Sequence, residues 1–397
     1  MLLMTERTRT RLTYPGSGRR RRMVAGDWII DDTFAQSDNL SARTYEQCID
    51  VNDSKGLDHP LDITFRDNRG LSLLNGRRTV GTAAQEYTNY VPSGQKTLLA
   101  HPSSSIPSIG ASALTLRART NPSREEVSLP VFIAELKDLP GMLKDTWRLK
   151  VVLRNAFRKG FVSKSRIASG HYLAYQFGWK PMISDIQKMF QFQAEVDRRN
   201  DELNRLYSSS GLKRRLKLYS EILTDEDSDV TIDSSLGILI RVRKIRVTKI
   251  ERWGTIRWRP TAVPPVSSRQ DLGRLARKLV FGLNHRGLDA AQAWELIPWS
   301  WLIDWFGNFD EWLQAHRNDI PAEPTGPCNI MTRTTTYETW QRIDGFQTSI
   351  TGASGVRSLE TKQRSQSSGS LSVTLPYLSG RQWSILGALN LQRLRVR

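Results

Sequence analysis

Clustered cations are the side chains of this sequence with the clearest chemical capacity, because each can hold a phosphate oxygen. The run "GSGRRRRM" places Arg19, Arg20, Arg21 and Arg22 side by side, and we expect a mobile arm there, for which solvated disorder is an equal alternative to phosphate contact. Two further groups fall in segments that we interpret as basic helices, and for these phosphate contact is favoured: Lys144, Arg148, Arg158 and Lys159, and Lys213, Arg214, Arg215 and Lys217.

The overall charge points the same way. Lys and Arg total 58 against 40 Asp and Glu, which gives a net charge of +18 and predicts a polyanionic partner. Nucleic acid is favoured over an anionic membrane, because no apolar run reaches bilayer length and no signal-peptide apolar region is present. Cys48 and Cys328 have no metal-ligand spacing, which leaves one disulfide open and indicates synthesis in a cytoplasm.

Catalytic motifs are not evident. The sequence has no GxGxxG, Walker loop, HExxH or CxxC pair. The acidic run "DEDSD" from Asp225 to Asp229 could hold a divalent metal for phosphoryl chemistry, but a solvated turn between a helix and a strand is favoured. His171 is typical of a packed or surface histidine. We therefore predict a protein that is not an enzyme and needs no metal, cofactor or small-molecule substrate.

A tryptophan-rich segment, "AWELIPWSWLIDWFGNFDEWL", covers residues 293–313. At 3.6 residues per turn, Trp301, Trp305 and Trp312 fall on one side of a helix that starts after Pro298. That side carries Leu and Phe but no Lys or Arg, which favours a protein core over a platform for stacking bases.

The order of expected elements is β, α, β, α, β, α, and the first third reads as irregular β-structure with a turn at Asn75-Gly76. The alternating segment 236–260 reads as strand with a bulge before Ile245. We predict an α+β protein with two lobes, a helical bundle and an antiparallel β-rich lobe, each built from discontinuous segments. The β-rich lobe comprises residues 1–128, 224–266 and 326–380, and the helical lobe comprises 129–223, 267–325 and 381–397.

Two motifs resemble the maturation protein (A protein) of levivirus-type single-stranded RNA bacteriophages. The first motif, in "YQFGWKPMISDIQ", comprises Phe177, Gly178, Trp179, Pro181, Ser184, Asp185, Ile186 and Gln187, and the second, in "WELIPWSWLIDWF", comprises Trp294, Glu295, Pro298, Asp304 and Trp305. The closing "LQRLRVR" also resembles the family. The first 120 residues and the strands after Cys328 show no such match.

The resemblance implies an elongated virion protein, a monomer present in a single copy and made in the host bacterial cytoplasm. Its helical lobe would bind the genomic single-stranded RNA. Its β-rich outer lobe would replace a coat-protein dimer and bind a host pilus (pilin) for RNA entry. The motif residues would be structural.

Receptor-binding residues cannot be assigned from the resemblance, and the loops at 68–75 and 352–355 are our candidates, since loops on a rigid sheet usually carry recognition. The alternatives are a cellular nucleic-acid-binding protein without a virion role and, less favoured, a metal-dependent nuclease.

Overall fold

A computed structural model of the chain describes residues 4–35, 40–51, 59–125, 192–235, 238–262, 275–276, 278–279, 308–344, 349–370, 380 and 382–386. Strands make up 57% of these residues and helices 19%. No helix among them is both long and apolar enough to cross a membrane.

The strands and helices follow one another along the chain with the bounds below. The strands are β1 (Met4–Leu12), β2 (Ser17–Val24), β3 (Asp27–Ala35), β4 (Arg43–Val51), β5 (Leu61–Leu71), β6 (Leu74–Val80), β7 (Ala83–Tyr90), β8 (Leu212–Ser235), β9 (Ile238–Pro260), β10 (Ala322–Pro324), β11 (Cys328–Arg342), β12 (Ile350–Thr351) and β13 (Gly355–Ser367). The helices are the short η2 (Leu40–Ala42), α1 (Ser93–Lys96), α2 (Ile109–Thr120), α6 (Phe192–Leu206) and α10 (Phe309–Ala315).

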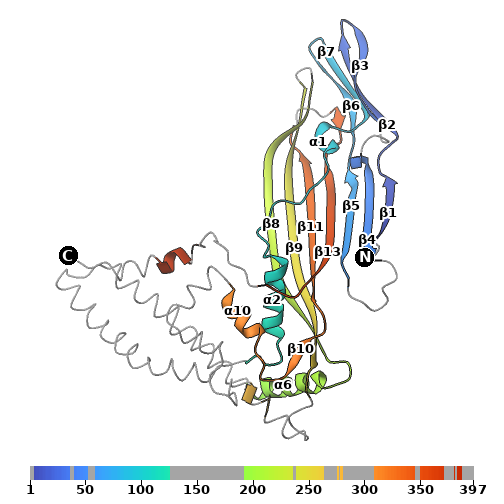
Figure 1. The fold of residues 1–397 in the computed structure, drawn as a ribbon. Coiled ribbons are helices and arrows are strands. Elements are labelled where there is room, and N and C mark those ends of the chain that lie inside the picture. Colours follow the sequence, from blue (N-terminus) through green and yellow to red (C-terminus); the bar gives the residue numbers. More distant parts are fainter. Residues whose placement is uncertain are drawn as a thin grey trace, which may run out of the picture. The chain divides into compact units, whose positions relative to one another are not determined.

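The strands form two sheets (Figure 1). The larger, eight-stranded sheet has the order β1-β4-β5-β13-β11-β9-β10, with β8 paired to β9, and the smaller has the order β12-β6-β7-β2-β3. The long strands β9 and β11 pair antiparallel without a register break from Asn329↔Thr255 to Arg342↔Val242. The chain divides into two compact units, residues 1–109 with 215–255 and 329–367 (unit 1), and residues 110–214 with 256–328 and 368–397 (unit 2).

The core of unit 1 lies between the two sheets, because each sheet has an apolar face that must leave water. Ile240 and Val242 of β9 and Trp340 of β11 are buried there against Leu74 and Tyr87 of the smaller sheet. On β9 the buried positions are the even-numbered ones, the period of two that a strand with one covered face requires. The odd-numbered residues of β9 therefore belong to the outer face of the larger sheet.

Residues 97–108 form a strap that crosses the inner face of the larger sheet. The carbonyl of Thr97 accepts a hydrogen bond from Arg357 (2.7 Å), and the carbonyl of Pro107 accepts one from Arg252. Between these anchors, the half-buried His101 ring lies 2.8 Å from Thr336 Oγ1 through Nδ1 and 3.0 Å from Thr361 Oγ1 through Nε2. Burial lowers the pKa of His101, so the strap is held by a neutral imidazole.

In unit 2, α2 packs on α10 through Leu114, Ala118 and Ala315. Asn121, which follows α2, donates to the carbonyls of Gln314 (3.0 Å) and Ala315 (3.2 Å), so one amide satisfies carbonyls at the end of α10. The last turn of α2 meets β9 through the indole of Trp258, which donates to Thr120 Oγ1 at 3.2 Å.

The predicted fold class is wrong in its helical half. The described residues are mostly strand, arranged in antiparallel sheets, and they show no helical bundle. The irregular β-structure expected near the N-terminus belongs instead to two regular sheets, because its short strands pair with one another and β5 also pairs with the distant β13. The residue boundaries of the two predicted lobes remain a prediction, since much of the expected helical lobe lies outside the described residues.

The segment from Leu212 to Leu223 is strand rather than the predicted basic helix. Its burial alternates, with Lys213, Arg215 and Lys217 exposed and the residues between them more shielded. Pairing of β8 with β9 stabilises the extended form, because tertiary context overrides the helix propensity of Leu, Lys and Arg.

Two predicted irregularities of the strands are also corrected. β9 has no bulge before Ile245; the inward positions there include the polar Thr248 and Arg252, so apolar Ile245 and Val247 occupy the outer face. Asn75-Gly76 is not a hairpin turn but lies within β6, where the register with β7 shifts between Leu74 and Gly76. Gly76 is required there, since its φ is +119° and a Cβ would lie 2.1 Å from the carbonyl oxygen of Ser349.

Other elements agree with the sequence. α6 buries Val196 and Leu203, two of the residues predicted seven apart on one helix face. β11 and β13 are confirmed as strands after the second predicted helical region. In the tryptophan-rich segment only Asn308 onwards is described; α10 is a helix, but Trp312 is 39% exposed and lies beside the His316 ring, so the expectation that it is core is wrong.

We expect Trp340→Ala to lower the free energy of unfolding by about 3 to 5 kcal/mol, because it removes a large buried side chain and leaves a cavity. Trp340 is 1% exposed, and its Nε1 donates to Glu338 Oε1 at 2.7 Å. Tyr337→Ala on the outer face of the same strand is the control; Tyr337 is 52% exposed, and its loss should cost less than about 1 kcal/mol. Denaturant titration measures both, and equal losses would contradict the placement of the core.

Candidate anion-binding surfaces

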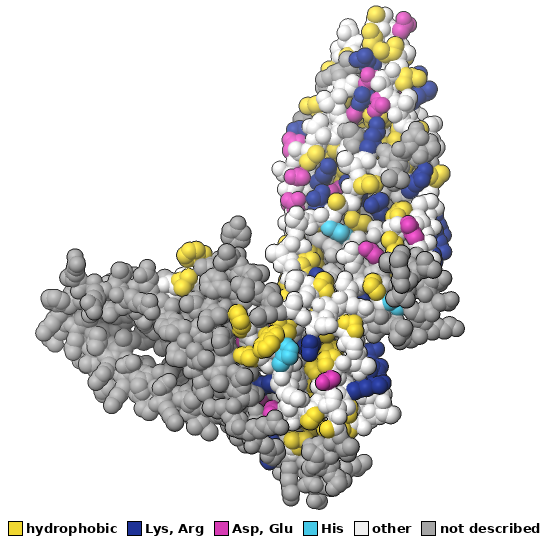
Figure 2. Space-filling view, in the orientation of Figure 1, with side chains coloured by type: hydrophobic (Ala, Val, Ile, Leu, Met, Phe, Trp, Pro, Cys, Tyr) yellow, Lys and Arg dark blue, Asp and Glu magenta, His cyan; other side chains and the backbone are white. Residues whose placement is uncertain are grey.

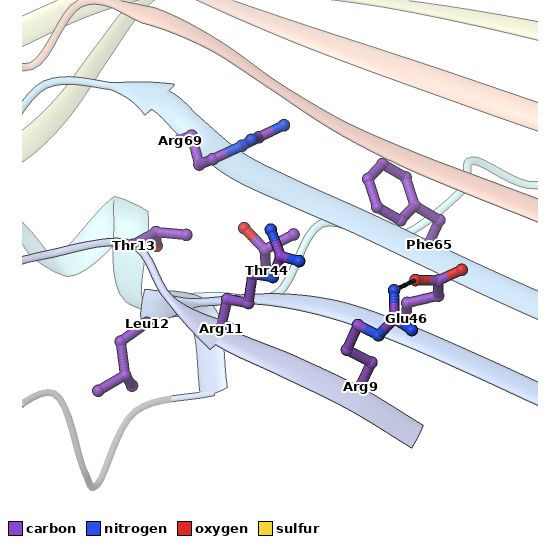
Figure 3. Close-up of a pocket in the computed structure, with 8 residues that line it drawn as sticks. All are labelled: Arg9, Arg11, Leu12, Thr13, Thr44, Glu46, Phe65 and Arg69. Atoms are coloured by element: carbon purple, nitrogen blue, oxygen red, sulfur yellow. Dashed lines mark ion pairs between the residues drawn. The ribbon is translucent and has the colours of Figure 1, made fainter. Parts of the chain in front are cut away.

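A cavity of about 390 Å³ opens on the outer face of the larger sheet, over the edge formed by β1, β4 and β5 (Figure 3). Three arginines line it: Arg9 and Arg11 from β1 and Arg69 from β5. The strand register explains the grouping, because Arg9 lies opposite Glu46 and Arg11 opposite Thr44, and Glu46 in turn lies opposite Phe65. Side chains in register on neighbouring strands share a face.

Positive charges outnumber negative ones in the cavity. Arg9 approaches Glu46 only to 3.9 Å, and both side chains are largely exposed. Arg69 pairs with Asp67 at 2.6 Å, and this hydrogen bond lowers the pKa of Asp67 and raises that of Arg69. Arg11 has no acidic partner among the described residues. The arrangement can attract a carboxylate or a phosphate group, with Arg11 as the available donor.

A second basic surface, which we call the β8–β9 basic patch, consists of Arg215, Lys217, Lys249 and Trp253. The Arg215 guanidinium lies 5.1 Å from the centre of the Trp253 ring. Lys217 and Lys249 both reach Glu251, at 3.5 and 3.0 Å, and Lys249 foremost lowers the pKa of that carboxyl. Three cations thus face one acid beside a partly exposed indole, the mixture of charge and aromatic surface that suits single-stranded nucleic acid.

The consecutive arginines on β2 are structural in three of four cases. Arg20 joins the two sheets through Asp31 (2.8 Å) and Asp233 (2.5 Å), and burial raises the pKa of Asp233. Arg21 pairs with Glu86 at 2.7 Å, and Arg22 lies 3.3 Å from Asp31. The expected mobile arm is therefore an ordered strand paired with β3 and β7, and of the four arginines Arg19 is exposed whereas the others are partly buried.

The second predicted cluster is split between two roles. Arg214 turns inward to Glu202 (2.8 Å), a carboxylate of α6 that also binds Arg124 (2.8 Å) and Arg199 (3.0 Å). Burial alone would raise the pKa of Glu202, but the three arginine charges hold it below the ordinary value. Lys213, Arg215 and Lys217 remain on the outside of β8.

The acidic run is not the predicted turn between a helix and a strand. Its residues lie within β8, and the arginines of β9 pair with them: Glu226 with Arg243 at 2.6 Å and Asp229 with Arg241 at 2.7 Å. Across the part of the chain that the structure describes, no group of three or more His, Cys, Asp or Glu residues could hold a metal ion. Cys48 and Cys328 are both free thiols, and burial raises the pKa of Cys328 to about 11.

The remaining predicted site residues lie outside the described residues. These are Lys144, Arg148, Arg158 and Lys159 of the first basic cluster, and the motif residues Phe177, Gly178, Trp179, Pro181, Asp185, Trp294, Glu295, Pro298, Asp304 and Trp305. Sequence reasoning missed the cavity arginines, although "RTRTR" in β1 has the alternation of an edge strand with one basic face. It also missed Lys249 and Trp253, although Lys249, Glu251 and Trp253 follow one another at intervals of two residues and so share one face of β9.

Comparison with known proteins decides the family. Residues 140–364 match the phage maturation protein family, which is more than half of the chain. The chain belongs to this family. The match includes both sequence motifs and the strands β8, β9 and β11, and no curated protein matches the sequence. The protein is thus a phage maturation protein and a virion component, in a family of structural and attachment proteins that are not known enzymes.

We expect Glu202→Gln to destabilise the protein by about 3 to 5 kcal/mol, because the change leaves buried arginines without their counter-charge. The pKa of Glu202 is lower in the folded than in the unfolded protein. The carboxylate therefore stabilises the fold at pH values above its unfolded-state pKa, and this stabilisation is lost as the pH falls through its folded-state pKa. Below about pH 4.5, the free energy of unfolding of the parent should therefore fall more steeply with decreasing pH than that of Glu202→Gln, which has no carboxyl group at this position.

The matched control is Glu195→Gln on the same helix. Glu195 pairs with Arg198, whose side chain is 56% exposed, so its loss should cost less than about 1 kcal/mol. Denaturant titrations between pH 3 and 7 compare the three proteins. Identical pH profiles for the parent and Glu202→Gln would contradict a structural role for the Glu202 cluster.

Proposed function

We propose that this phage maturation protein binds the single-stranded genomic RNA, sits in the capsid among coat-protein subunits, and attaches the particle to a host pilus before the RNA enters the cell. RNA binding is supported mainly by the β8–β9 basic patch. The net charge of +18 of this family member supports it as well. A cellular nucleic-acid-binding protein without a virion role does not account for the family membership.

The patch is suited to single-stranded RNA for two reasons. Arg215 and Lys217 stand at alternate positions on one exposed strand face and can follow a phosphate backbone. The Trp253 ring offers a surface on which a base can stack. The acids that neutralise cations elsewhere, such as Glu226 and Asp229, lie further along β8 and leave this end of the strand with excess positive charge. Lys144, Arg148, Arg158 and Lys159 are further candidates for phosphate contact.

We expect Arg215→Gln with Lys217→Gln to weaken RNA binding and to flatten its salt dependence. If both cations contact phosphates, the slope of log K against log salt should fall by about 1.4 to 1.8 in total, through lost counterion release. Arg214 is kept, because it supports Glu202. The measurement is fluorescence anisotropy with genomic RNA fragments at several salt concentrations.

The control for that experiment is Arg119→Gln with Arg205→Gln, which removes the same charge from two exposed arginines of α2 and α6. It should leave the slope nearly unchanged. If both double variants lower the slope equally, binding follows net charge, and the patch has no specific part in it.

The proposed attachment surface is one end of the smaller sheet, where apolar side chains are exposed. The β2–β3 turn, where Ala25 and Gly26 have positive φ, lies beside the β6–β7 turn at Gly81, because β2 and β7 are antiparallel neighbours. Around these turns Val24, Ile29, Ile30 and Val80 are 38–60% exposed, and apolar side chains are visible at this end in Figure 2. An exposed apolar group beside basic side chains is typical of a protein-binding surface.

The loops suggested from sequence are less suited to attachment, because they bind each other. Ser72 N donates to the carbonyl of Ser354 (3.0 Å), Ala353 N donates to that of Ser72 (3.0 Å), and Gly352 and Gly355 lie too close to 70–74 backbone to accept a Cβ. Substitutions there should damage the fold before they test recognition.

We expect particles carrying Ile30→Asp with Val80→Asp to package RNA normally but to adsorb to piliated cells at least about tenfold less than the parent, since central apolar contacts dominate protein interfaces. Ile222→Asp, at a 64% exposed apolar residue of β8, is the matched control and should adsorb as the parent does. If particles with the double variant adsorb normally, this end of the sheet is not part of the attachment site.

A further inference from the structure

β1 is an edge strand whose side chains are exposed rather than packed in the core, and it is nevertheless a regular strand. It ends the order of the larger sheet, and its nine residues pair with β4 in unbroken register from Met4↔Val51 to Leu12↔Arg43. From Glu6 to Leu12 every residue is exposed, so both faces of the strand meet solvent, and no described strand pairs with its outer edge.

Free edges of this kind are usually protected, because their unpaired N–H and C=O groups can pair with another chain. β1, "MTERTRTRL", contains no proline and no bulge, and it is longer than a typical strand. Among the described residues its protection is charge, from Arg7, Arg9 and Arg11. Arginines keep away a basic or apolar strand, but they attract an acidic one.

The three arginines form a regular row. They stand two residues apart on one face, which spaces them by about 6.8 Å along the strand. Arg7 Nη2 lies 3.6 Å from Cys48 Sγ, whereas Arg9 and Arg11 line the cavity of about 390 Å³ that Arg69 closes from β5. Leu12, 63% exposed, adds an apolar contact at the end of the row.

We propose that the β1 edge, with Arg9, Arg11 and Arg69, is a docking site for an extended acidic segment of a protein partner, which adds as a further strand to the sheet. Its backbone pairs with the free edge of β1. Its carboxylates, at alternate positions, face the arginine row and enter the cavity, as recognition by strand addition combines backbone pairing with pockets for alternate side chains.

The local charges favour an acidic peptide over RNA. Glu46 lies in the cavity, Asp67 binds Arg69, and Glu6 precedes the arginine row on the same strand. These carboxylates interrupt the positive surface that a continuous phosphate backbone requires, but they do not obstruct separate carboxylates placed between them. The free peptide groups of the strand edge also match another peptide backbone and have no counterpart in RNA.

The probe is a fluorescent nine-residue peptide with glutamate at three alternate central positions and threonine or valine elsewhere, titrated with the purified full-length protein. Arg9→Gln with Arg11→Gln should weaken its binding about 3- to 30-fold, the range for two exposed charge pairs. Arg119→Gln with Arg205→Gln removes equal charge and should change binding less than about twofold. Thermal melting verifies that each variant is folded.

Two further probes decide between strand addition and simpler attraction. In one peptide the glutamates are N-methylated, and in another the residues between them, so that each blocks a single strand edge. Strand addition requires that one of the two loses binding while the other keeps it; equal binding of both overturns the proposal. A nine-nucleotide oligouridylate should bind weakly and be indifferent to Arg9 and Arg11. If it binds more tightly than the peptide and depends on those arginines, the site is for RNA and the proposal fails.

The outcome is independent of the RNA proposal for the β8–β9 basic patch. β1 and β8 lie toward opposite ends of the strand order in the larger sheet, and the two sets of substitutions share no residue. Loss of RNA binding through Arg215 and Lys217 leaves the peptide experiment unaffected.

Discussion

Packing of two antiparallel sheets face to face is the constraint on which the rest of unit 1 depends. Once the inner faces are covered, alternation along each strand decides which side chains can meet a partner molecule and which must be satisfied internally. Arg252, Arg357 and Glu338 fall on inner positions and are at most 6% exposed. Burial would raise the pKa of Glu338, but Arg357 foremost holds it below its usual value.

A basic composition therefore does not translate directly into a basic surface. Arg20 binds Asp233, 213 residues away in sequence, and so joins β2 of one sheet to β8 of the other. Arg214 is similarly engaged by Glu202. Basic and acidic side chains are interspersed over much of the face seen in Figure 2. At the cavity beside β1 and at the β8–β9 basic patch, cations outnumber the acids beside them. Location on a strand, rather than clustering in sequence, separates the two roles.

The same constraint explains how far the sequence could be interpreted. β11 and β13 alternate apolar or Thr residues with polar ones and were predictable. The first half of β8, from Leu212 to Leu223, was predicted as a basic helix because its Leu, Lys and Arg residues have good helix propensity, and the pairing with β9 overrides that propensity. β1 and β2 were missed, since a strand of Arg and Thr has no apolar period and the strands that β1 and β2 pair with, such as β4 and β7, lie elsewhere in the sequence. The family was recognised from the two sequence motifs, although the residues of these motifs lie outside the described parts of the chain.

Long strands give this protein a way to keep several interactions apart without separate folds. On β8 and β9, the half near Asp229 and Arg241 is neutralised by cross-strand pairs, while the half near Arg215 and Trp253 keeps a surplus of positive charge. β1 meanwhile carries its charge at the opposite edge of the sheet, with a free backbone beside it. Because each surface is fixed by register within one sheet, a substitution at one edge can change its binding while the shared core holds the others in place.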